Sequence, residues 1–69
     1  MHCRIRINGY LSSSWREWFE QLEIAQEETG TTLLCGQLED QAALYSVLLK
    51  IRNLGLALIA LETSEFPLT

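Results

Sequence analysis

The fold is decided by residues 31–61, which read TTLLCGQLEDQAALYSVLLKIRNLGLALIAL. Residues 31–38 combine β-branched and apolar side chains on both faces, which is typical of a central strand. Asp40 is a suitable N-cap for a helix over residues 41–53, in which apolar side chains recur at helical spacing. The uncharged run 56–61 then predicts a further strand. The apolar stripe of the helix consists of Leu44, Val47, Leu48, Ile51 and Leu54.

A half-buried strand precedes this unit at residues 2–8, HCRIRIN, where polar and apolar side chains alternate. Successive side chains of a strand point to opposite faces of the sheet, so Arg4 and Arg6 should share the outer face. The side chains that we expect to point inward are Cys3, Ile5 and Ile7.

A short helix is expected after this first strand. The pattern S-x-x-E at residues 14–17 fits a capping box, in which a hydroxyl and a carboxylate bond the free amides of a helix start. An apolar stripe follows and predicts about two helical turns. Residues 22–27 then form a strand and residues 28–30 a turn, in which Gly30 can take a positive φ. The stripe of this short helix consists of Trp15, Trp18, Phe19 and Leu22.

The resulting order of strands and helices predicts an α+β fold of the ferredoxin-like βαββαβ type. Its four-stranded antiparallel sheet would carry both helices on one face, because crossover connections are right-handed. The expected strand order is fourth, first, third, second. We expect residues 1–62 to form this single domain and residues 63–69 to form a flexible C-terminal tail.

Composition limits the compartment and the partners of the protein. The chain has 69 residues and two cysteines, too few for the disulfide framework of a small secreted domain. No signal peptide is visible and no apolar run is long enough to cross a bilayer, so we expect a cytoplasmic protein. The formal net charge of −4 disfavours nucleic acid and anionic membranes as partners, because both carry negative phosphate groups.

Few side chains offer catalytic or metal-binding chemistry. Alternation points His2 away from Cys3, and the two thiols of Cys3 and Cys35 do not complete the four ligands of a structural zinc site. The serines at residues 12–14 have no evident base beside them and are best used to cap a helix. We therefore expect no metal, no cofactor and no enzymatic activity, with the cysteines acting as small apolar residues.

Three segments of the chain resemble sequences from a group of short bacterial proteins. They are G-T-T-x-L at residues 30–34, D-Q-A-x-L at residues 40–44 and I-R-x-L-G-L at residues 51–56. The resemblance implies a bacterial origin and a common fold over most of residues 3–62. The group has no assigned activity, so the resemblance carries over no functional residue.

The function that these features favour is that of a small interaction module. We expect it to form a homodimer, or to bind a protein partner, through its sheet. The outer face would hold an apolar patch beside the two arginines, and the last strand would lie at a sheet edge that carries no charge over residues 54–61. The residues expected at this interface are Arg4, Arg6, Leu34, Leu58, Ile59 and Ala60.

The alternative function is that of a regulatory domain that binds a small effector molecule at a dimer interface. Gly9, before the first helix, and Asp40, at the start of the second, would then lie beside the ligand. Such a site needs several polar groups that converge, and the sequence does not show them. The interaction module is therefore preferred.

Overall fold

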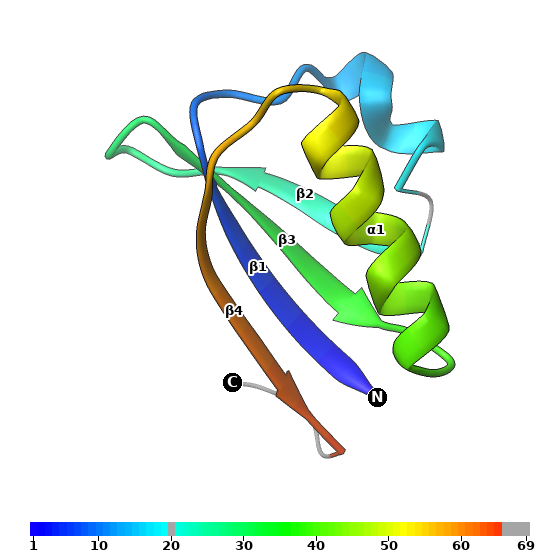
Figure 1. The fold of residues 1–69 in the computed structure, drawn as a ribbon. Helices are drawn as coiled ribbons and strands as arrows, with labels where there is room; N and C mark the ends of the chain where they lie inside the picture. The colour runs from blue at the N-terminus through cyan, green and yellow to red at the C-terminus, as the bar shows by residue number, and fades with distance from the viewer. Residues whose placement is uncertain (20, 66–69) are drawn as a thin grey trace.

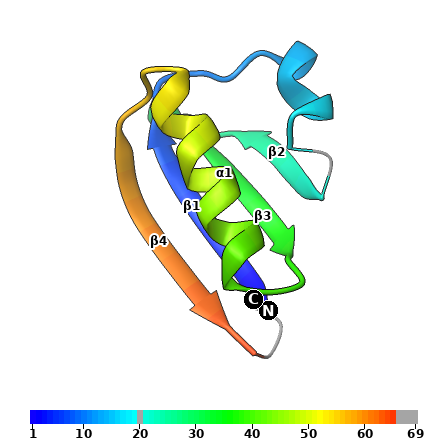
Figure 2. The same ribbon diagram turned by 45° about the vertical axis from the view of Figure 1, so that its right-hand side comes forward.

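The computed structural model describes residues 1–19 and 21–65, which form one sheet with a helix packed on one face (Figures 1 and 2). The domain is of the α+β class, and every neighbouring pair of strands is antiparallel. One of its helices, η1, is a short 3-10 helix. The elements follow in the order β1 (His2–Asn8), η1 (Ser13–Glu17), β2 (Leu22–Gln26), β3 (Thr31–Gln37), α1 (Gln41–Asn53) and β4 (Leu58–Ser64).

The strands lie in the order β2-β3-β1-β4, which is the order expected from the sequence. β1 is a central strand, and its residue Ile5 lies opposite Leu34 of β3 and Leu61 of β4. Because directly opposite residues of an antiparallel pair point to the same side, these three side chains share the face of the sheet toward α1. β2 and β4 are the two edge strands.

The hydrophobic core lies between the sheet and α1. The helix begins after Asp40, the predicted N-cap, whose carboxylate accepts a hydrogen bond from the Ala43 amide at 2.9 Å. Within the predicted apolar stripe, Leu48 and Leu54 are only partly buried against the core. The buried core consists of Leu44, Val47 and Ile51 of α1 together with Cys3, Ile5, Ile7, Leu11, Phe19, Leu22, Leu34 and Leu38.

The predicted first helix is not an α-helix. Residues 13–17 form η1, which the Trp15 amide opens by donating to the Ser12 carbonyl at 3.0 Å. The Ser14 hydroxyl, predicted to cap a helix, instead donates to the Ser12 hydroxyl at 3.1 Å. So short a segment forms too few i→i−4 hydrogen bonds to offset helix nucleation, whereas a 3-10 turn still carries Phe19 into the core. The described residues thus contain one α-helix where the prediction had two.

Leu34 lies in the core and not on the outer face, so the prediction that placed it in an outer patch was wrong. Its side chain is fully buried opposite Ile5, whereas its neighbours Leu33 and Cys35 point to the other face and are half-buried. The segment is apolar on both faces, and alternation alone therefore cannot assign its sides. The pairing with β1 assigns them.

β4 begins and ends later in the chain than predicted. The sequence placed this strand at residues 56–61, and the structure has it at Leu58–Ser64. β4 continues to Ser64 because β1 offers it hydrogen-bonding groups along its whole length, as far as His2, the first residue of β1. The predicted flexible tail, 63–69, therefore starts too early, since its first two residues belong to the sheet. Residues 66–69 lie outside the described residues.

The register of β3 can be tested with two neighbouring leucines. We expect Leu34→Ala to lower the free energy of unfolding by about 2–5 kcal/mol, because it leaves a cavity in the core. Leu33→Ala removes a half-buried side chain on the other face and should cost about 1 kcal/mol. Urea unfolding followed by tryptophan fluorescence measures both values. Equal losses for the two variants would show that the faces of β3 are assigned wrongly.

Candidate functional site

Large apolar side chains are exposed on both α1 and β4. Within the described part of the chain, five of the seven large apolar residues that are exposed come from these two elements. β4 runs along the edge of the sheet that α1 leaves uncovered (Figure 2). We call these five residues the α1–β4 surface. They are Tyr45 (60% exposed), Leu49 (51%), Leu58 (48%), Ile59 (50%) and Leu61 (39%).

The exposure of β4 follows from the dimensions of the elements. A helix with its side chains is about 10 Å wide and neighbouring strands lie about 4.8 Å apart, so one helix covers about two strands. Ile5 and Leu61 are direct neighbours on the face toward α1, yet Ile5 is fully buried and Leu61 is 39% exposed. The cover that α1 provides therefore ends between β1 and β4.

The two flanks of α1 face different surroundings. Ala43, Ser46 and Lys50 line a hollow whose other side includes Trp18 and Phe19. Successive residues of an α-helix are about 100° apart, which puts Tyr45 and the partly buried Leu48 on the other flank, toward β4. Tyr45 of α1 thus lies on the same side of the domain as β4.

β4 has few of the features that protect an edge strand from pairing. Its register against β1 shifts between Arg6 and Ile7, and Ile59 has no partner in that register. Such a bulge increases the local twist and is one protection against edge-to-edge pairing. Glu62 is the one charged residue of β4, and its carboxylate lies 3.5 Å from the Arg4 guanidinium on the face away from α1. The edge therefore stays mainly apolar.

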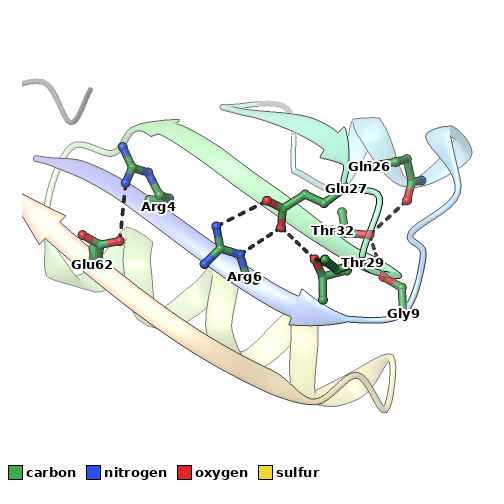
Figure 3. Close-up of polar contacts among 9 residues, drawn as sticks. Arg4, Arg6, Gly9, Gln26, Glu27, Thr29, Thr32 and Glu62 are labelled. Atoms are coloured by element: carbon green, nitrogen blue, oxygen red, sulfur yellow. Dashed lines mark hydrogen bonds and ion pairs between the residues drawn. The ribbon is translucent and has the colours of Figure 1, made fainter.

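The face of the sheet away from α1 is polar (Figure 3). The Arg6 guanidinium donates to both carboxylate oxygens of Glu27, at 2.9 and 3.3 Å, and the Thr31 hydroxyl donates to the same carboxylate at 2.8 Å. These hydrogen bonds, from Arg6 first and then Thr31, hold the pKa of the Glu27 carboxyl below its ordinary value. With the Arg4–Glu62 pair, two ion pairs lie on the face that was predicted to hold an apolar patch.

The structure separates the residues that were predicted to form one interface. Leu58 and Ile59 belong to the α1–β4 surface. Ala60 lies opposite Arg6 on the polar face, where both predicted arginines take part in ion pairs. Leu34 is in the core. The edge strand β4 therefore carries exposed apolar residues, as predicted. The outer face of the sheet carries ion pairs in place of the predicted apolar patch.

Sequence reasoning missed the two residues that α1 contributes. Tyr45 and Leu49 lie one helical turn apart and outside the stripe that packs on the sheet. Apolar side chains on the outer side of an amphipathic helix were the signal that could have revealed them.

Gly9 and Asp40, the residues considered for an effector site, are not brought together. Gly9 follows β1 and Asp40 follows β3, and the two strands are antiparallel, so the residues lie at opposite ends of the sheet. The Gly9 carbonyl accepts a hydrogen bond from the Thr32 hydroxyl at 2.7 Å, while Asp40 caps α1. Both residues therefore have structural roles.

The two cysteines lie on neighbouring strands but on opposite faces of the sheet. Cys3 points into the core, and Cys35 lies opposite Arg4 on the polar face. Burial raises the pKa of the Cys3 thiol. Among the described residues, no group of three or more His, Cys, Asp or Glu side chains is placed to hold a metal ion.

These features define a small α+β domain with a polar sheet face and an apolar surface at one sheet edge. Its chain belongs to the family described as "Domain of unknown function (DUF8691)", whose model matches residues 2–62. Neither the curated proteins nor the solved structures give a match. No helix in the described part of the chain is long and apolar enough to span a membrane.

The Arg6–Glu27 pair predicts a pH dependence of stability. Because the folded-state pKa of Glu27 is lowered, its stabilisation is fully present above the ordinary carboxyl pKa of about 4.3 and is lost as the pH falls through the folded pKa. Glu27→Gln should therefore lower the melting temperature at neutral pH, and the difference from the wild type should shrink as the medium becomes acidic. Glu23→Gln, a change on the same face of β2, is the control. If the difference in melting temperature between Glu27→Gln and the wild type stayed the same from neutral to acidic pH, the Arg6–Glu27 pair would not be the source of the stabilisation.

Proposed function

We propose that this domain is a small non-enzymatic interaction module that forms a homodimer through β4. The observation that carries the proposal is the α1–β4 surface. Three of its residues lie on one edge strand and are 39–50% exposed. Removing such apolar area from water is the dominant favourable contribution to protein association, and exposed apolar patches mark binding surfaces.

A second copy of the chain fits this edge well. Two copies of one strand related by a two-fold axis run antiparallel, so the N–H and C=O groups of the edge match each other. With the axis at Leu61, the two Leu61 side chains would meet on the face toward α1. The two Glu62 carboxylates would not lie directly opposite each other, which avoids the repulsion of facing like charges.

The open face of the sheet is a weaker candidate for the dimer interface. Burying it would take the Arg6–Glu27 and Arg4–Glu62 ion pairs out of water, and the cost of desolvating an ion pair can exceed its attraction. The edge carries no such cost apart from Glu62. We therefore assign the interface to β4 and not to the sheet face.

The finer fold assignment belongs to the same proposal. We infer a ferredoxin-like fold whose first helix is reduced to η1, and the strand order and antiparallel directions support this inference. A fold of this kind normally has two helices to cover four strands. In the dimer, the second copy would give β4 the cover that α1 and η1 leave incomplete.

The dimer can be tested by light scattering after size exclusion at micromolar concentration. We expect a mass of twice the 7.9 kDa chain for the wild type. Ile59→Lys should give the monomer mass, because it places a charge in the apolar edge, and its fold should persist because Ile59 is half exposed. Circular dichroism checks that the variant is folded.

The matched control for this experiment is Glu23→Lys, which changes an exposed residue on the opposite edge strand. This variant should keep the dimer mass. A wild-type mass near 7.9 kDa would refute the dimer. A dimer that both variants disrupt equally would show that β4 is not its interface.

A further inference from the structure

A second surface feature lies on the flank of α1 away from β4. It is a half-open hollow of about 230 Å³ between α1 and four residues from the region of η1 and β2, namely Trp18, Phe19, Gln21 and Leu22. Its apolar lining comes from Phe19, Leu22 and Val47, which also belong to the core. Trp18, itself 44% exposed, forms part of the wall. Apolar side chains together with a few polar groups are the materials of a small-molecule site, and a volume below the roughly 300–1,000 Å³ of typical pockets restricts this hollow to a small ligand.

The side chain of Lys50 places a positive charge at this hollow. The Lys50 ammonium donates a hydrogen bond to the Trp18 carbonyl at 2.7 Å and so holds the wall against the helix. An ammonium group has three donors, and this bond uses one of them. Although the chain has a net charge of −4, the positive charge of Lys50 at the hollow would attract a negatively charged group of a ligand.

The wall of the hollow contacts the neighbouring strand β3 closely at a glycine, Gly36. A Cβ atom at Gly36 of β3 would lie only 2.7 Å from the Gln21 carbonyl oxygen and 3.2 Å from the Leu22 Cα. The chain around Gln21 is therefore packed directly on β3, an approach that a larger residue than glycine would prevent. Gln21, whose backbone makes this close contact, also lines the hollow.

We propose that the hollow binds a small monocarboxylate with a flat apolar body. The apolar part would lie against Trp18, Phe19 and Val47, and the carboxylate would accept a hydrogen bond from the Lys50 ammonium. The hydroxyl of Ser46, which also lines the hollow, already donates to the Ala42 carbonyl at 3.1 Å.

The chemistry of the hollow favours this class of ligand over others. One lysine balances a single negative charge, whereas phosphate groups are usually held by several cations or by backbone amides. The volume suits a ligand of roughly ten non-hydrogen atoms, for which a dissociation constant in the millimolar range is expected. The site is separate from the β4 edge, so it does not depend on the proposed dimer.

Phenylacetate is a suitable probe, and the tryptophans supply a signal. The Trp15 and Trp18 rings lie edge to face with centroids 4.9 Å apart, so a ligand beside Trp18 should change the fluorescence. Titration of the full chain, with backbone amide shifts recorded in parallel, should show saturable binding that maps to residues around Trp18 and Lys50. Phenylacetamide, the uncharged analogue, should bind about tenfold more weakly, as expected for the loss of a charged hydrogen bond.

Two variants and one control complete the test. Lys50→Met should weaken phenylacetate binding about tenfold, and Ser46→Phe should abolish it by filling the hollow from an exposed helix position. Arg52→Met removes another cation of α1 that does not line the hollow, and it should leave binding unchanged. The proposal is wrong if phenylacetate gives no saturable shift, if the amide binds equally well, or if Arg52→Met weakens binding as much as Lys50→Met.

Discussion

The register of β1 between β3 and β4 is the constraint on which the rest of the structure depends. It places Ile5 between Leu34 and Leu61, and this row defines the face of the sheet that packs on α1. The same register turns Arg6 to the other face, where it reaches Glu27. A shift of one residue would exchange the two faces and bury the arginines, which explains why the strand cannot slip.

The incomplete cover of the sheet follows from this register together with the absence of an α-helix from the described residues of the connection after β1. That connection contains the five-residue 3-10 helix η1 in place of an α-helix, and Phe19, which follows η1, is buried in the core. α1 covers the centre of the sheet. The inward-facing residues Leu58 and Leu61 of β4 are then left partly in water, although they lie on the same face as the buried Ile5 and Ile7.

The sequence predicted the strands, the strand order, α1 with its Asp40 cap and the positive φ of Gly30, because each depends on local periodicity or on one residue's chemistry. It failed at Leu34, because a strand that is apolar on both faces shows no alternation, and only the pairing with Ile5 assigns its side. The surface residue Tyr45 was missed for a related reason: whether an apolar residue at the border of a helical stripe is covered depends on neighbouring elements.

α1 separates the two surfaces that carry the proposals. Tyr45 lies on the flank toward β4, and Lys50 lies on the flank toward η1. A second copy seated on β4 would therefore leave the hollow open, and a ligand in the hollow would leave β4 free to pair. The residues of α1 between these flanks, Leu44, Val47 and Ile51, are buried against the sheet. Because the two surfaces lie on opposite flanks of α1 and share no residue, we expect the two binding events to be independent.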